Sequence, residues 1–459
     1  MRFPLGFLWG AASAAYQTEG NPAGDGKGPS IWDVFSHKPG ATFQGHTGDT
    51  ACDTCRRWES DLDLMTGLGI PNYRFSLSWP RVLPDGTGRV NEAGLAFYDR
   101  LVDGCLRRGI EPWVTLYHWD LPQTLEDRGG WRVRETAEAF ANYAKIVAAH
   151  FRGRVRHYFT LNEPQCVSVL GYGTGEHAPG LRLGLAEVFQ CHTNLMLAHG
   201  MAVSAVREAD PEARVGLAST GNLCYPDTDS SADIEAARAL SFTPWGDDCS
   251  GQLFNHQWFL DPVLLGRFPD AGNEALLRAA EGVSPADLAV MRQPLDFLGL
   301  NIYHGRRAHM TEAGPAFVPA VPGAPMTAMK WYVTPEILRW GPRWSWERYG
   351  LPLYISENGL SCNDKIYQDG RVHDAERIDF LARYLEQLGL GIADGTPVNG
   401  YFHWSLTDNF EWSHGYKERF GLIYIDYSTQ RRTPKDSAFW YRDVIRGNDL
   451  NGGTNHETV

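Results

Sequence analysis

Residues 298–303 read Leu-Gly-Leu-Asn-Ile-Tyr and residues 353–356 read Leu-Tyr-Ile-Ser, so both runs are short and almost continuously apolar. Runs of this kind are typical of parallel strands that are buried on both faces. Further β-rich runs of similar length occur on either side of these two. The expected strands are Phe7–Ala14, Asn72–Trp79, Pro112–Trp119, His157–Asn162, Arg214–Ser219, Phe297–Tyr303, Leu353–Glu357 and Asn399–Ser405.

Amphipathic stretches separate these runs. Thr136–Phe151 and Glu92–Arg108 both repeat apolar residues at helical spacing. An alternation of strand and helix that recurs eight times predicts an α/β fold, a single (β/α)₈ TIM barrel with extended βα loops. Such a barrel can exceed roughly 400 residues as one domain, so we expect residues 1–447 to form one catalytic domain and residues 448–459 a polar C-terminal tail.

Charge and hydropathy exclude several classes of partner. The net charge is −13 and no cluster of Lys and Arg is present, so we expect neither nucleic acid nor a membrane as a partner. The first residues, Met1 to Tyr16, could be read as a short signal peptide, but the apolar run leads directly into polar Gln17. We favour a first strand over a signal peptide and expect a cytoplasmic protein.

The eight cysteines are scattered along the chain. Cys52 and Cys55 form a C-x-x-C pair, but no second pair or spaced histidine pair completes a zinc site. We therefore expect free thiols, no metal and no cofactor.

Polar and aromatic residues gather where the expected strands end. Examples are His118-Trp119, Asn162-Glu163 and Glu357-Asn358. The C-terminal strand ends form the active-site face of a TIM barrel, so these side chains indicate a catalytic site there.

Glu163 and Glu357 close the fourth and seventh expected strands. Cleavage of a glycosidic bond needs such a pair: one carboxyl group attacks the anomeric carbon and the other protonates the leaving oxygen. A single glutamate at a strand end is more often a buried member of an ion pair. Two of them, each beside an asparagine and each followed by a proline or glycine turn, favour catalysis.

Several motifs resemble one family. Thr160-Leu-Asn-Glu-Pro164, Ile355-Ser-Glu-Asn-Gly359, the block FLWGAASAAYQTEG at residues 7–20 and the block DNFEWSHGYKERFGL at residues 408–422 look like glycoside hydrolase family 1. RFSLSWPRVLPDGTG, VTLYHWDLPQ and LGLNIY add to the match, which runs from about residue 7 to residue 446. Each motif alone is weak evidence, whereas the ordered set is specific.

The resemblance implies a retaining β-glycosidase that acts on terminal β-glucosyl residues, with β-fucosides, β-galactosides and transglycosylation as expected side activities. It assigns Glu163 as acid/base and Glu357 as nucleophile. Arg74, Tyr303 and Asn301 are expected to support the nucleophile, with Arg74 lowering its pKa. Burial and the charge of Glu357 are expected to raise the pKa of Glu163.

The resemblance also implies a sugar-binding set. It comprises Gln17, His118, Trp119, Asn162, Trp404, Glu411, Trp412 and Phe420, with Trp331 on the leaving-group side. Gln17 and Glu411 are expected to bridge sugar hydroxyls, and Asn162 to hold the 2-hydroxyl. Taken singly, His118 could equally be a core histidine and Trp404 ordinary packing.

Glu411 bears on the choice of sugar. A carboxylate beside the 4- and 6-hydroxyls would repel a 6-phosphate, so we expect unphosphorylated β-glucosides or short oligosaccharides as substrates. On the leaving-group side, Gln165 replaces the tryptophan that is common in the family, and Asn222 is a candidate polar contact.

Three alternatives remain open: a non-catalytic sugar-binding relative, an inverting or thioglucoside-cleaving enzyme, and a different TIM-barrel enzyme. The first usually lacks one glutamate, and the thioglucoside-cleaving enzymes usually have glutamine in place of Glu163. Whether the protein is a monomer or a homo-oligomer is left undetermined.

Overall fold

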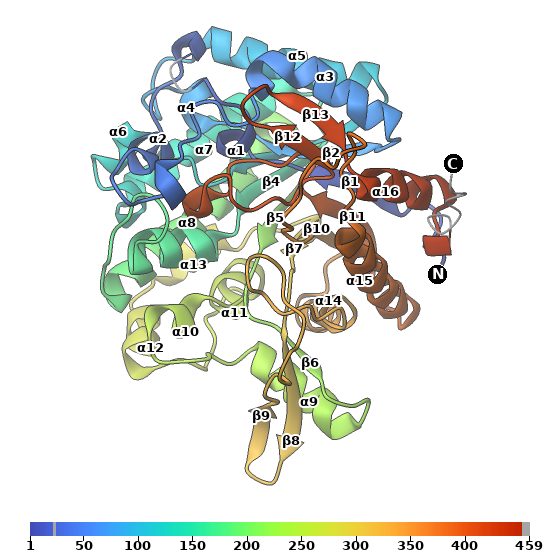
Figure 1. Ribbon diagram of the computed structural model, residues 1–459. Helices are drawn as coiled ribbons and strands as arrows, with labels where there is room; N and C mark the ends of the chain where they lie inside the picture. The colour runs from blue at the N-terminus through green and yellow to red at the C-terminus, as the bar shows by residue number, and fades with distance from the viewer. Residues whose placement is uncertain (22–23, 452–459) are drawn as a thin grey trace.

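The computed structural model describes residues 1–21 and 24–451 and shows a closed barrel of parallel strands (Figure 1). The barrel order is β1-β11-β10-β7-β5-β4-β3-β2. Its strands are β1 (Leu8–Ala12), β2 (Asn72–Ser76), β3 (Glu111–Tyr117), β4 (His157–Asn162), β5 (Arg214–Ser219), β7 (Phe297–Asn301), β10 (Leu353–Asn358) and β11 (Val398–Trp404). All eight predicted strands are therefore confirmed, including the first, which was weighed against a signal peptide.

Most strands end a few residues before the predicted boundary. β2 stops at Ser76 because the chain then turns into the short helix α4 (Trp79–Val82). β3 stops at Tyr117, and Trp119 already has a positive φ of 78°. The C-terminal strand ends are thus places where the backbone leaves the ladder and turns side chains into the barrel mouth.

Two separate apolar layers stabilise the barrel because alternate residues of a strand face opposite sides. Inside the barrel, Trp113 packs edge-on against Phe297, Tyr354 and Phe402, with ring centroids 5.0–5.6 Å apart. The interior is therefore filled with aromatic rings and forms an apolar floor beneath the barrel mouth.

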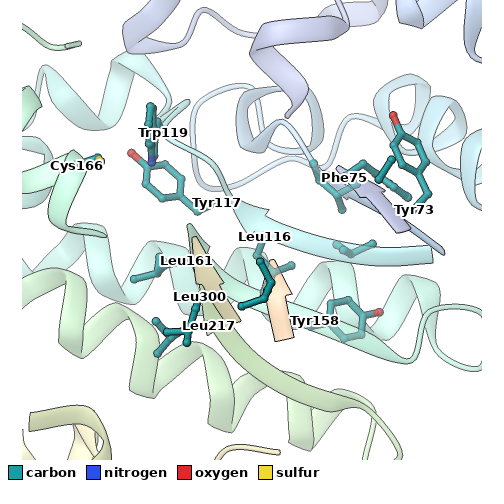
Figure 2. Close-up of a cluster of buried hydrophobic side chains, with 14 of the residues drawn as sticks. Tyr73, Phe75, Leu116, Tyr117, Trp119, Tyr158, Leu161, Cys166, Leu217 and Leu300 are labelled. Atoms are coloured by element: carbon teal, nitrogen blue, oxygen red, sulfur yellow. The ribbon is translucent and has the colours of Figure 1, made fainter. Parts of the chain in front are cut away.

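The outer layer lies between the strands and the surrounding helices. Leu116, Leu161, Leu217 and Leu300 come from neighbouring strands of the barrel and are fully buried in this layer, part of which Figure 2 shows. The helices that cover it are α3 (Thr54–Gly67), α5 (Glu92–Arg107), α7 (Arg134–Phe151), α8 (Leu185–Ala209), α14 (Ile337–Tyr349), α15 (Ala375–Ala393) and α16 (Asp436–Gly447). The two helices predicted from periodicity correspond to α5 and α7.

Shorter helices occupy the connections. They are α1 (Ala15–Thr18), α2 (Ile31–Ser36), α6 (Gln123–Glu126), α9 (Ser231–Ser241), α10 (Cys249–Leu253), α11 (Gln257–Leu260), α12 (Glu274–Glu281) and α13 (Pro285–Met291). A π-helix, Cys166–Thr174, follows β4 directly. Local capping sets several of these starts: Ser30, for example, accepts from the backbone N–H of Asp33 at the beginning of α2.

Two small sheets extend the βα loops, as predicted. β6 (Cys224–Pro226), β8 (Arg306–Thr311) and β9 (Gly314–Phe317) form one sheet in the order β6-β8-β9, and the β8–β9 hairpin projects from the barrel at the bottom of Figure 1. The hairpin of β12 (Ile423–Asp426) and β13 (Arg431–Pro434) follows β11.

The last described residues lie beside the N-terminal segment. Asn448, the first residue of the predicted polar tail, accepts from Trp9 Nε1 at 2.9 Å and donates to the Phe3 carbonyl at 2.9 Å. The first residues of this tail are therefore anchored to the N-terminal segment, and residues 452–459 lie outside the described part of the chain.

All eight cysteines, the C-x-x-C pair included, are free thiols. Among the described residues, no helix is both long enough and apolar enough to cross a membrane.

Candidate active site

Glu163 and Glu357 line one cavity of about 460 Å³ at the barrel mouth. Glu357 belongs to β10. Glu163 follows β4 directly and has a positive φ of 46°, an uncommon conformation for a residue with a side chain, while its backbone N–H donates to Ala218 O at 2.8 Å. Such strain at a cavity wall is typical of functional positions.

Glu357 is held by two donors. Arg74 Nη1 donates to Oε1 at 2.6 Å and Tyr303 OH donates to Oε2 at 2.7 Å. Burial raises the pKa of Glu357 above its ordinary value, and Arg74 and Tyr303 oppose that rise. Arg74 therefore lowers this pKa as predicted, but burial outweighs its effect and the net shift is upward.

Glu163 has weaker partners. Asn301 Nδ2 donates to Oε1 at 2.9 Å, and the thiol of Cys166 donates to Oε2 at 3.4 Å. Burial, and then the charge of Glu357, raise the pKa of Glu163 to about 8. Among residues 1–21 and 24–451 no cation contacts Glu163, so it keeps its proton more readily than Glu357, which Arg74 contacts.

A buried network joins the two glutamates. Asn162 Oδ1 accepts from Arg74 Nη2 at 2.6 Å and from Asn301 Nδ2 at 3.0 Å. Ser356 Oγ donates to Asn301 Oδ1 at 2.6 Å and fixes the orientation of that amide. The two carboxyl groups are thereby positioned by one continuous set of side chains from β2, β4, β7 and β10.

His118 has one nitrogen available at the cavity wall. Asn162 Nδ2 donates to His118 Nε2 at 3.1 Å, which leaves Nδ1 as the protonated nitrogen; it is buried and has no partner within the described chain. Burial, and secondly Arg74, hold the pKa of His118 well below its usual range. His118 is therefore a neutral side chain in the cavity lining, with a buried Nδ1–H donor that has no partner among the described residues.

Gln17 and Glu411 are in contact at the same end. Gln17 Nε2 donates to Glu411 Oε2 at 3.2 Å, and Gln17 Oε1 is a buried acceptor without a partner in the described residues. Burial raises the pKa of Glu411 to about 8, and the charges of Glu357, Glu418 and Glu163 add to the effect. Glu411 therefore carries a proton for much of the time near neutral pH, and it repels a phosphate less than the sequence suggested.

Aromatic rings wall the cavity on two sides. Trp412 stacks with Tyr16 at 6.1 Å between centroids and contacts Trp119 at 4.6 Å. Trp331 contacts Tyr303 at 5.2 Å and Phe420 at 6.2 Å on the other side. Trp404 also lines the cavity, and its ring lies 5.8 Å from that of His118.

The structure brings most of the predicted site residues together. The cavity lining contains Glu163, Glu357, His118, Trp119, Tyr303, Trp331, Trp404, Glu411, Trp412 and Phe420. Gln17, Arg74, Asn162 and Asn301 do not line it and act through the contacts described above. Asn162 in particular is engaged by three neighbours, which leaves its predicted contact with a 2-hydroxyl without support in this geometry.

Neither of the two residues assigned to the leaving-group side lines the cavity itself. Gln165 is fully buried behind Glu163, where its Nε2 donates to Ser219 Oγ at 2.9 Å, and it does not line the cavity. Asn222 lines an adjacent groove instead.

Sequence reasoning missed several residues of the lining. They are Cys166, Leu170, Glu176, His177, Thr220, Phe254, His304, Met329 and His414. Cys166 lies one helical turn after Glu163, a spacing that could have identified it. Leu170 lies in the same π-helix and His414 in a short 3-10 helix, whereas the others lie outside regular helices, where no periodicity indicates which side chains face inward.

No group of three or more His, Cys, Asp or Glu side chains that could hold a metal ion occurs in residues 1–21 and 24–451. The described lining of the cavity also contains no lysine or arginine.

The pattern of a buried glutamate pair, aromatic walls and a closed barrel agrees with comparisons to known proteins. The model of glycosyl hydrolase family 1 matches residues 1–450. The chain belongs to this family. Among family 1 relatives, it is 43% identical to β-glucosidase A of Thermotoga maritima over 98% of this chain and 99% of that one. It is 44% identical to a β-glucosidase of an Agrobacterium species over 97% and 96% of the two chains.

A solved family 1 structure has the same architecture. The β-glucosidase of Thermotoga maritima in complex with deoxynojirimycin has a TM-score of 0.88, with 43% identity over 98% of this chain and 99% of that chain. A bifunctional β-D-glucosidase/β-D-fucosidase of Bifidobacterium breve is 44% identical over 97% of this chain and 98% of its own.

Proposed function

We propose that this protein is a retaining β-glucosidase in which Glu357 is the nucleophile and Glu163 the acid/base. The observation that carries the proposal is the unequal environment of two carboxyl groups in one cavity: Arg74 contacts Glu357 at 2.6 Å, and no cation contacts Glu163 among the described residues. Membership of family 1, in which retention is general, and relatives named β-glucosidase support it.

In the first step, a carboxylate oxygen of Glu357 attacks the anomeric carbon and the glycosidic C–O bond breaks. The proton of Glu163 moves to the leaving oxygen. Glycosylation removes the charge of Glu357, so the pKa of Glu163 falls and it can take a proton from water. That water attacks the anomeric carbon in the second step and releases Glu357.

The sugar is an unphosphorylated β-glucosyl unit. His118, whose Nδ1 is a buried donor without a partner in the described residues, and Glu411, which Gln17 holds in place, are the groups for its hydroxyls, and Trp404 is the ring for its apolar face. Exclusion of a 6-phosphate follows less from the charge of Glu411 than from the absence of Lys and Arg in the described lining. The same proposal includes activity on β-fucosides, which the Bifidobacterium breve relative supports, and activity on β-galactosides. It also includes transglycosylation and a cytoplasmic location.

Hydrolysis of 4-nitrophenyl β-glucoside, followed by ¹H NMR of the first product, tests this proposal. We expect β-glucose to form first and to mutarotate afterwards. An initial α-anomer would contradict retention, and a lack of hydrolysis would favour the non-catalytic alternative.

A further inference from the structure

Two grooves continue from the cavity on its leaving-group side. One, of about 990 Å³, shares His304 with the cavity. The other, of about 660 Å³, shares Leu170 and Phe254 with it. Trp245 and Arg306 line both grooves and therefore lie where the two meet.

The guanidinium of Arg306 packs against two aromatic rings that also contact each other. Its Cζ lies 3.7 Å from the ring centroid of Phe317 and 5.2 Å from that of Trp245. Trp245 is itself fixed, because its Nε1 donates to the carbonyl of Leu240 at 2.8 Å. Contacts of this kind orient the planar fork before a ligand arrives and reduce the entropy lost on binding.

Arg306 is exposed and has no carboxylate partner among residues 1–21 and 24–451. Its neighbour Arg307 pairs with Asp227 at 3.2 Å. The third arginine in the described lining of the larger groove, Arg383, has its Nε 2.8 Å from Asp379. Arg306 is thus the one lining guanidinium whose charge is left without an ion pair there.

The backbone holds Arg306 at a defined distance from the catalytic end. Gly305 N donates to Thr334 Oγ1 at 2.9 Å, and a Cβ at Gly305 would lie 2.4 Å from Ile337. His304, two residues before Arg306, contacts Trp331 at 5.4 Å between centroids. Two residues of extended chain span about 7 Å, so Arg306 lies about that far beyond His304, which lines the cavity. A leaving group must therefore be longer than one ring to reach Arg306.

We propose that Arg306 is a specificity-determining residue that binds a carboxylate at the far end of the leaving group. This proposal rests on the β-glucosidase activity proposed above. The chemical reason is charge: the protein has a net charge of −13 and the ionised nucleophile Glu357 lies at the bond that breaks, so an anion is disfavoured near that bond. Arg306, whose guanidinium is preorganised and has no ion pair, lies farther from the bond that breaks and favours an anion there. A carboxylate matches the planar fork of its N–H groups.

A cello-oligosaccharide oxidised to an aldonic acid at its reducing end fits this requirement. Cellotrionate releases a disaccharide acid as leaving group, and cellotriitol is its neutral, equally acyclic counterpart. Values of kcat/KM for both substrates, measured at low ionic strength on the native protein, R306Q and R307Q, isolate the role of this charge. R307Q is the matched control because Arg307 is already paired with Asp227.

We expect the native protein and R307Q to prefer cellotrionate over cellotriitol on the order of tenfold, as for one charge-assisted hydrogen bond. R306Q is expected to lose the preference and R306K to regain part of it, while added NaCl weakens it in the native protein. Hydrolysis of 4-nitrophenyl β-glucoside should be unchanged in every variant, and this establishes that they fold.

Equal kcat/KM for the two substrates in the native protein, or a preference that survives in R306Q, would overturn the role of Arg306. Failure of the native protein to cleave 4-nitrophenyl β-glucoside would instead overturn the proposed function, so the two failures are distinguishable.

Discussion

The two ends of the active-site cavity are built differently. At the sugar end, Gln17, His118 and Trp404 are buried: His118 and Trp404 lie at the ends of β3 and β11, and Gln17 lies in α1, which follows β1. At the leaving-group end, His304 and Arg306 are exposed and come from long loops and the small β6-β8-β9 sheet. A buried, barrel-supported end holds the chemistry and the sugar in one geometry, whereas a loop-built end can vary in what it accepts without disturbing the catalytic pair.

The largest effect is expected from Glu357→Gly at the buried end. Removal of the nucleophile should lower kcat by more than about 10⁴-fold, because Glu163 and Glu357 act as a unit and the loss of one removes the contribution of both. Steady-state assays with 4-nitrophenyl β-glucoside measure this. Glu312→Gly, an exposed position in the β8–β9 turn, is the matched control and should keep full activity.

Glu163→Ala should affect substrates according to how strongly their leaving groups need a proton. An alkyl β-glucoside has a poor leaving group and should lose on the order of 10²–10⁴-fold in kcat/KM. A 2,4-dinitrophenyl β-glucoside needs no proton, so its glycosylation step should be largely retained. Similar losses for the two leaving groups would remove Glu163 from the acid role.

Substitution of Trp331 and of Trp404 should affect different parts of substrate recognition, the leaving group in the first case and the sugar in the second. Trp331→Ala is expected to lower kcat/KM about tenfold for cellobiose, as for loss of one aromatic contact of up to roughly 1.5 kcal/mol. The ratio of rates for 4-nitrophenyl β-glucoside and β-fucoside should stay constant. Trp404→Ala should change that ratio instead. A change of sugar preference in Trp331→Ala would contradict the division of the cavity into two ends.

The smallest effect concerns the thiol beside Glu163. Catalysis needs Glu163 protonated, so activity should fall as pH rises through about 8, the raised pKa of Glu163. On the acid side, activity should fall once Glu357 gains a proton.

Because the Cys166 thiol stabilises the charged form of Glu163, Cys166→Ala should move the alkaline limb upward by less than about one pH unit. Cys166→Ser retains a donor and is expected to leave the limb in place, and a profile that is identical in the alanine variant would exclude this contact from catalysis.

Much of the barrel was predictable because its strands carry a physical signal that survives in the sequence. Continuous apolar runs such as residues 298–303 must be buried on both faces, and polar residues at their ends have only the barrel mouth to occupy. The glutamate pair, Arg74, Tyr303 and the aromatic walls followed from this arrangement together with the family motifs.

The remainder depended on tertiary packing. Gln165 is two residues from Glu163 in sequence, yet the turn after β4 directs it into the core. His304 and Arg306 lie in a connection whose course is set by Thr334 and Ile337, far away in the chain. The net direction of the Glu357 pKa shift could not be predicted from its hydrogen-bond partners alone, because its burial in the folded barrel decides the sign.

Covalent trapping tests the unequal roles of the two glutamates most directly. Incubation with 2,4-dinitrophenyl 2-deoxy-2-fluoro-β-glucoside, which forms the glycosyl-enzyme intermediate but turns it over slowly, should leave one fluoroglucosyl group on the protein. Peptide mass spectrometry is expected to find that group on Glu357. A label on Glu163 or Glu411, or hydrolysis of ordinary β-glucosides without any label, would contradict the account.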